Sequence, residues 1–171
     1  MPIYAKAGAS FTPAPAGAHP AVCCDVVDLG DITIEYQGKA KTQHKIKIVW
    51  QIEELRADGH PHQIRKQYTL SLHDKASLRK DLEAWRGKQF TEEELRGFDV
   101  EQLLDKPCLL NVIHREANGN TYANVSAIMR LPKGMTAPNV VDYVRECERQ
   151  PAEGQPPQYA GPEITDDDVP F

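Results

Sequence analysis

Residues 44–52, HKIKIVWQI, constrain the fold more than any other segment, because apolar and polar side chains alternate along them. A period of two is that of a β-strand, whose successive side chains point to opposite faces of a sheet. The two faces would carry Ile46, Ile48, Trp50 and Ile52 on one side, and Lys45, Lys47, Val49 and Gln51 on the other. The segment therefore predicts a half-buried strand with a cationic outward face.

Further short runs of β-forming residues flank this strand and are separated by turn-forming residues. Leu29-Gly30-Asp31 interrupts the first run, which favours one long strand bent at a glycine bulge. Asp58-Gly59 and Asn118-Gly119-Asn120 each separate two runs and predict two hairpins. Besides residues 44–52, the predicted strand segments are residues 22–27 with 32–36, 63–72, 108–114 and 121–130.

The period changes after residue 72. Leu78, Leu82 and Trp85 fall on one helical stripe behind Asp74, a suitable N-cap, and predict a helix of about three turns. Thr91, followed by three glutamates, predicts a second, short helix. Both Trp50 and Trp85 share a face with aliphatic residues, so the pattern favours the core over stacking on a base, which stays the alternative.

The order strand, strand, strand, helix, strand, strand is that of an OB-fold, a five-stranded barrel with its helix between the third and fourth strands. We therefore expect an all-β fold with one main helix over residues 21–134, as the single domain of a 171-residue chain. The Ala-, Gly- and Pro-rich residues 1–20 predict a flexible arm. Residues 135–150 predict a linker, with a short helix at 139–149, and residues 151–171 a disordered tail.

The charge is distributed unevenly along the chain. The net charge is −5, and residues 151–171 contain five acidic and no basic residues. The body is therefore neutral overall, with 20 basic and 20 acidic residues. Within it, residues 39–88 carry 12 Lys or Arg against 6 Asp or Glu, a local basic region of the kind that binds nucleic acids.

An OB-fold binds oligonucleotides across its second and third strands, helped by the loops that join strands one to two and four to five. Lysines and arginines interleaved with tyrosines occur in those segments, including the predicted loop 37–43. Cations can follow phosphates while rings stack on bases, without sequence preference. The alternative is a solvated strand face. The candidate DNA-binding residues are Tyr36, Lys39, Lys41, Lys45, Lys47, Arg65, Lys66, Tyr68, Arg115 and Tyr122.

Other chemistry finds little support in the sequence. The four cysteines and six histidines show no metal-ligand spacing, and no nucleophile motif or glycine-rich phosphate loop is present. We therefore expect no metal, no cofactor and no enzymatic activity. No long apolar run predicts a membrane span or a leader peptide, so we expect a cytoplasmic protein with reduced thiols.

The last seven residues, TDDDVPF, are the most specific feature of the chain. They resemble the C-terminal tip of bacterial single-stranded DNA-binding proteins, in which aspartates precede an aliphatic residue, Pro and Phe. Residues 62–134 loosely resemble the diverged OB-fold ssDNA-binding proteins of tailed phages and prophages. A merely solubilising tail would explain the aspartates but not the Pro-Phe ending.

The resemblance implies a role for each residue of the tip. In that family the Phe ring enters an apolar pocket of a replication or repair enzyme, and the aspartates meet its basic rim. Phe171 would be the anchor, supported by Asp166, Asp167, Asp168, Val169 and Pro170. The implied partners are ssDNA and a helicase, primase, nuclease or polymerase. The acidic tail is also suited to visit the protein's own cationic groove until DNA displaces it.

Two other functions remain as alternatives. The domain could be a replisome adaptor that binds proteins and not DNA, or a nuclease or other enzyme of phage recombination. Salt-dependent binding of oligo(dT) would separate the first from an ssDNA-binding protein, and a metal-dependent activity assay would test the second. The sequence leaves the oligomeric state open.

Overall fold

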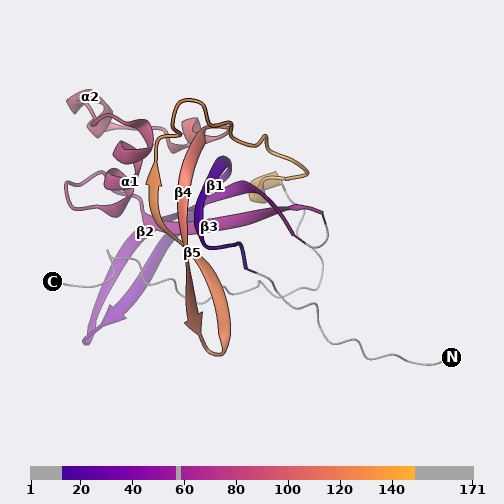
Figure 1. Ribbon diagram of the computed structural model, residues 1–171. Helices are drawn as coiled ribbons and strands as arrows, with labels where there is room; N and C mark the ends of the chain where they lie inside the picture. Colours follow the sequence, from indigo (N-terminus) through magenta and orange to yellow (C-terminus); the bar gives the residue numbers. More distant parts are fainter. Residues whose placement is uncertain (1–12, 57–58, 149–171) are drawn as a thin grey trace.

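The computed structural model describes residues 13–56 and 59–148. The predicted tail and its tip, Asp166 to Phe171, lie outside the described residues. One antiparallel sheet with the strand order β3-β2-β1-β4-β5 dominates the fold (Figure 1). Its strands are β1 (Gly17–Tyr36), β2 (Lys39–Leu55), β3 (Pro61–Thr69), β4 (Pro107–Ala117) and β5 (Asn120–Met129). The mostly β class and the five strands are as expected.

The sheet is open, which corrects the prediction of a five-stranded barrel. The edge strands β3 and β5 touch each other, but no ladder joins them within the described chain. The helix α1 (Ser77–Arg86) packs against both edge strands. On the β5 side, the backbone N–H of Arg130 donates to the carbonyl of Ala84. The helix therefore contacts both edges of the sheet, which approach each other without pairing.

Strand β1 is long and bent, as its glycine predicts. Its pairing with β2 shifts register between Cys23 and Asp25 and again between Asp28 and Gly30. Gly30 has a φ of 72°, and its N–H donates to the Asp28 carboxylate at 2.8 Å. The second irregularity is therefore a bulge that needs glycine.

The beginning of the chain departs from the expected flexible arm. Residues 17–20 belong to β1 and lie opposite β4, and Ala14 is buried. The Ala- and Pro-rich composition offered no local reason for order, but β4 supplies a backbone partner that only the folded chain brings near. Residues 1–12 lie outside the described part.

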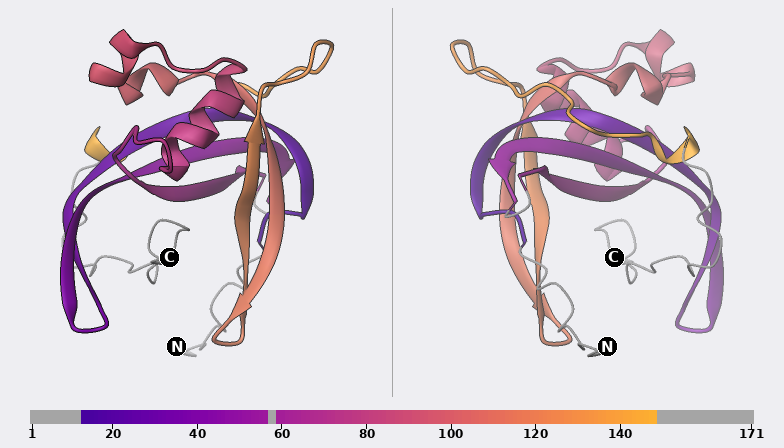
Figure 2. Two further views of the ribbon diagram at one scale, coloured as in Figure 1. Left: turned by 90° about the vertical axis from the view of Figure 1, so that its left-hand side faces the viewer. Right: turned by 90° about the vertical axis from the view of Figure 1, so that its right-hand side faces the viewer.

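Two hairpins extend beyond the body of the sheet as arms. The first arm (residues 31–44) turns at Gln37 and Gly38, with φ of 51° and 77°, and the second arm (residues 113–124) turns at Asn118 and Gly119, with φ of 51° and 78°. Two successive positive φ values define a tight two-residue hairpin turn. The predicted loop 37–43 is thus mostly strand. Figure 2 shows both arms projecting to the same side.

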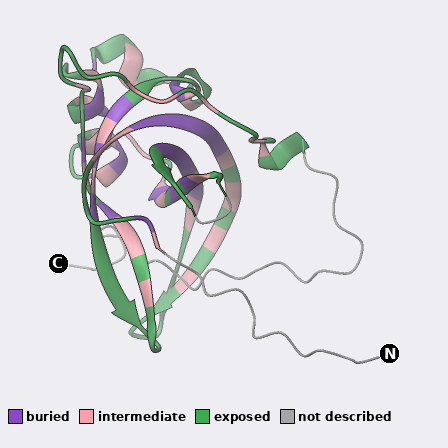
Figure 3. Ribbon diagram, turned by 45° about the vertical axis from the view of Figure 1, so that its right-hand side comes forward, coloured by how far each residue is buried: buried purple, intermediate pink, exposed green. Residues whose placement is uncertain are grey.

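The core lies on the face of β2 that the alternation predicts. Ile46, Ile48, Trp50 and Ile52 are buried, and so are Leu78, Leu82 and Trp85 of α1. The Trp50 and Trp85 ring centroids are 6.0 Å apart, so both tryptophans are core residues. Figure 3 shows the buried centre of the sheet and the largely exposed arms.

The helix boundaries agree with the sequence in part. α2 (Glu92–Arg96) has the expected Thr91 cap with a complete capping box, and η1 (Val100–Leu103) follows it. The N-cap of α1 is Ala76 and not Asp74, whose carboxylate instead accepts from Arg79 Nη1 at 2.6 Å. In the predicted helix 139–149, only η2 (Glu146–Glu148) is helical in the described part.

Candidate nucleic-acid interface

The first arm carries cations and a tyrosine on one face. Tyr36 lies opposite Lys39, and Ile34 lies opposite Lys41. Because β2 alternates without interruption, Lys39 and Lys41 share a face with Lys47 and Val49, opposite the core residues. We call this the outer face of the sheet. Tyr36 is 49 % exposed, so its ring is available to a ligand.

The second arm repeats this arrangement. Arg115 lies directly opposite Tyr122, and Ile113 lies opposite Asn124. These residues alternate with buried Val112 and therefore also lie on the outer face. Tyr122 is 43 % exposed. Each arm thus pairs an exposed phenol ring with a cation across a ladder.

The acidic residues of the arms lie on the opposite faces. Glu35, opposite Ala40, alternates with Tyr36, and Glu116, opposite Thr121, alternates with Arg115. In the described part of the chain, no ion pair or side-chain hydrogen bond engages Lys39, Lys41 or Arg115. The outer face of both arms therefore offers cations that no neighbouring acid neutralises.

A histidine cluster marks the base of the first arm on its acidic face. His44 Nε2 lies 2.7 Å from Asp28 Oδ1, and His44 Nδ1 lies 3.1 Å from Asp31 Oδ1. The hydrogen bond to Asp28 is the main cause of a raised His44 pKa, and the Asp28 charge and the hydrogen bond and charge of Asp31 raise it further. The cluster adds acidic groups to the face that lacks the arm cations.

The outward cations of the central β2 are engaged within the protein, which corrects the expectation for Lys45 and Lys47. Lys45 is buried, and its Nζ donates to Thr69 Oγ1 at 2.9 Å. Lys47 has 13 % of its side chain exposed and pairs with Glu146 at 2.7 Å. The outer face of central β2 is therefore covered, unlike that of the arms.

The covering segment is residues 139–148, which we call the strap. The Gln51 side chain donates to the Val141 carbonyl at 2.8 Å and accepts from the Val141 N–H at 2.9 Å. Figure 2 shows the chain after β5 crossing the sheet to reach η2. Side chains of the sheet satisfy backbone groups of the strap, which explains why most of the predicted helix is absent.

Asp25 is the second anchor of the strap. Its buried carboxylate accepts from the Tyr143 hydroxyl at 2.8 Å, the Arg145 Nε at 3.3 Å and the Glu146 N–H at 2.8 Å. Burial alone would raise the pKa of Asp25, but these hydrogen bonds and the Arg145 charge outweigh it and lower the pKa below its ordinary value. The carboxylate is thus held in its charged form.

Two candidates on β3 face the helix and not the outer surface. Tyr68 is buried and donates to Asp81 Oδ2 at 2.7 Å. Lys66 pairs with the same carboxylate at 2.9 Å and lies over the Tyr68 ring. Both alternate with Arg65, which is exposed on the outer face opposite Val49. Of the β3 candidates, only Arg65 remains open to a ligand on that face.

The described residues offer no metal site. They contain no group of three His, Cys, Asp or Glu side chains placed to hold a metal ion. Cys23, Cys24 and Cys108 are buried thiols, and burial raises the pKa of Cys23 and Cys108. Among the described helices, none has the length and apolar character of a membrane span. Comparison of the chain with protein-family models and with curated proteins finds no match.

Proposed function

We propose that this protein is a single-stranded DNA-binding protein that holds its ligand along the outer faces of the two arms. The observation that carries the proposal is the separation of charge on both arms: Tyr36, Lys39 and Lys41 on one, and Arg115 with Tyr122 on the other, with acids on the opposite faces. Exposed rings beside unneutralised cations suit a ligand with accessible bases and a phosphate backbone.

The arrangement favours single strands over duplex DNA. An unpaired base presents a face on which a phenol ring can stack, whereas the bases of a duplex are already stacked on each other. The cations follow the backbone and give affinity without reading sequence. Binding would be stoichiometric, without turnover and without a cofactor.

We further propose that the domain is an OB-fold variant whose sheet stays open. The strand order β3-β2-β1-β4-β5 and the position of α1 between β3 and β4 support this assignment. In an OB-fold, the loops between strands one and two and between strands four and five help bind oligonucleotides. The two arms occupy those positions in the chain.

The biological role follows from the tip. The resemblance of residues 165–171 to the bacterial tip supports a protein that coats ssDNA in replication or recombination, in the cytoplasm, and recruits a helicase, primase, nuclease or polymerase. The body would hold the DNA while the tip contacts the enzyme.

Titration of a labelled oligo(dT) at two salt concentrations tests the proposal. The double variant Lys39→Ala/Lys41→Ala should bind more weakly, and its salt slope should fall by about 0.7 per lost phosphate contact. The matched control is Lys75→Ala/Lys80→Ala, which removes two exposed lysines away from the arms. Absence of oligo(dT) binding at low salt would reject the proposal and favour a protein-binding adaptor.

A further inference from the structure

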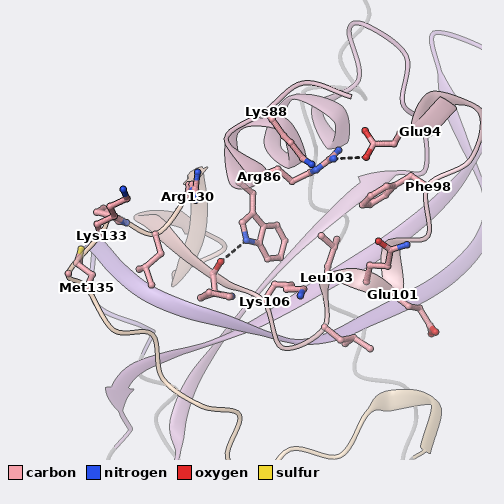
Figure 4. Close-up of a pocket in the computed structure, with 17 residues that line it drawn as sticks. Arg86, Lys88, Glu94, Phe98, Glu101, Leu103, Lys106, Arg130, Lys133 and Met135 are labelled. Atoms are coloured by element: carbon pink, nitrogen blue, oxygen red, sulfur yellow. Dashed lines mark hydrogen bonds and ion pairs between the residues drawn. The ribbon is translucent and has the colours of Figure 1, made fainter. Parts of the chain in front are cut away.

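A pocket of about 880 Å³ lies at the helical end of the molecule (Figure 4). It is formed by the end of α1, the segment from α2 to β4, and residues 130–135 after β5. Apolar side chains supply much of its lining. They are Trp85, Phe98, Leu103, Leu104, Leu131 and Met135.

The polar lining of the pocket is predominantly cationic. Lys88, Lys106, Arg130 and Lys133 are exposed, and no side-chain hydrogen bond or ion pair engages them within the described ranges.

The two acids of the lining are already paired. Glu94 pairs with Arg86 at 2.6 Å, and Glu101 pairs with Arg145 at 2.9 Å. Lys88 also lies near Glu94, whereas no acid among the described residues pairs with Lys106, Arg130 or Lys133. The pocket therefore combines a cationic rim with an apolar lining, and its ligand should be both anionic and apolar.

We infer that this pocket holds the chain's own C-terminal tip, residues 166–171. The tip carries three negative charges, on Asp166, Asp167 and Asp168. Val169, Pro170 and Phe171 supply the apolar part. Three aspartates thus meet a cationic lining, and one aromatic ring meets the apolar side chains of the pocket.

The chain is long enough for this contact. Residues 149–165 separate the described end of the chain from the tip, and 17 residues can span roughly 55 Å when extended. A globular domain of this size has a diameter of roughly 40 Å. A tether of this kind gives the tip a local concentration in the millimolar range, so even a weak contact is populated.

This location differs from the cationic groove that the sequence suggested for the tail. The helices around the pocket lie at the end of the molecule away from the arm tips (Figure 2). A tip in the pocket therefore leaves the arms open. Docking would withhold the tip from partner enzymes and not from DNA, which goes beyond the proposed function.

A labelled peptide of residues 163–171 tests the inference on the full-length protein. The Phe171→Ala variant lacks the anchor of its own tip, so it should bind the peptide at least about tenfold more tightly than the wild type, whose tip competes. In that background, Lys88→Glu/Lys133→Glu should reduce peptide binding at least about tenfold by charge repulsion. Both lysines are exposed, so the fold should persist, and circular dichroism would verify it.

The matched control is Lys39→Glu/Lys41→Glu on the first arm, again with Phe171→Ala. It should leave peptide binding unchanged and weaken oligo(dT) binding. The pocket variant should weaken peptide binding and leave oligo(dT) binding unchanged. Each readout therefore reports on one surface, and failure of one proposal is distinguishable from failure of the other. Loss of peptide binding in the arm variant but not in the pocket variant, or equal peptide affinity of wild type and Phe171→Ala, would overturn the inference.

Discussion

Gln51 holds Val141 by two hydrogen bonds, although 90 residues separate them in the chain. The side-chain amide of Gln51 donates to the backbone carbonyl of Val141 and accepts from its backbone N–H. One side chain thus satisfies the two backbone groups that a neighbouring strand would otherwise bond. Val141 and Val144 are themselves exposed. Polar anchors, and not apolar burial of these valines, therefore hold the strap over β2.

Replacing Gln51 should release the strap. Gln51→Ala removes both hydrogen bonds and should lower the free energy of unfolding by about 1–3 kcal/mol. Hydrogen exchange at the Val141 N–H should accelerate. Denaturant unfolding measures the first effect and mass spectrometry the second. The control is Gln63→Ala, because Gln63 lies directly opposite Gln51 on β3 but is exposed. Equal effects of the two substitutions would mean that Gln51 does not anchor the strap.

The strap should also respond to acid through Asp25. Its pKa is lowered in the folded protein from an ordinary value of 3.8, so its stabilising contribution is complete above that value and is lost as the pH falls through the lowered pKa. Asp25→Asn should lower stability at pH 7 by about 1.5–3 kcal/mol, the range for hydrogen bonds to a charged group. The stability of the variant should depend less on pH below 4 than that of the wild type. A parallel pH dependence of the two proteins would exclude Asp25 as the group responsible.

Lysines on the arm part of β2 and on the covered central part of β2 should contribute differently to DNA binding. Lys41→Ala should weaken oligo(dT) binding and reduce the salt slope by about 0.7, because none of the described acids pairs with this lysine and it is available to a phosphate. Lys47→Ala should have a much smaller effect, because Lys47 is paired with Glu146. Titrations at several salt concentrations compare the two variants. A larger loss with Lys47→Ala would indicate that the DNA displaces the strap.

Substitution of an arm tyrosine should change DNA affinity, whereas substitution of the core tyrosine should change the stability of the domain. Tyr36→Ala or Tyr122→Ala should weaken ssDNA binding by about 1–3 kcal/mol if the ring stacks on a base, with little change in thermal stability. Tyr68→Ala should instead destabilise the domain by about 3–5 kcal/mol, because it empties a core position and leaves Asp81 without its hydroxyl donor. Thermal melts and titrations of the same variants give both quantities. Intact DNA affinity in both arm variants would remove the stacking role.

The tip should act on partner proteins without affecting the fold. Phe171→Ala should abolish most of the binding to replication enzymes, because the phenyl ring supplies the apolar anchor while the aspartates mainly steer association. Capture of a candidate helicase or polymerase on immobilised protein measures it, with thermal melting as the control for folding. If the Phe171→Ala variant captures the enzyme as well as the wild type, the tail has no anchoring role and acts only as a solubilising segment.

The candidate site was accessible from the sequence in part. Tyr36, Lys39, Lys41, Arg115 and Tyr122 stand out as ring and cation residues near predicted turns. Their arrangement on one face depends on the turn at Gln37 and Gly38, which the sequence did not mark as tight because Gln-Gly is not among the preferred hairpin pairs. The sequence did not predict the pocket, because the residues that line it come from separate segments of the chain.

Local periodicity was sufficient for the elements and for much of the core. The alternation of residues 44–52 identifies Ile46, Ile48, Trp50 and Ile52 as inward, and the stripe of Leu78, Leu82 and Trp85 identifies the inner side of α1. These patterns reside within a few residues of one another. The apolar face of a helix or strand is buried whichever element packs against it. The inward residues can therefore be predicted without knowing which element that is.

Only the tertiary structure determined which polar side chains are exposed and which are buried or paired. Lys45 and Lys47 look like solvent-facing cations, but Thr69 and Glu146 engage them from distant parts of the chain. Tyr68 becomes a core residue because α1 places Asp81 against it, and the same helix contacts both edge strands of the open sheet. A polar side chain is stable in water or in a satisfied contact, so only the chain segments that folding brings near it determine which environment it has.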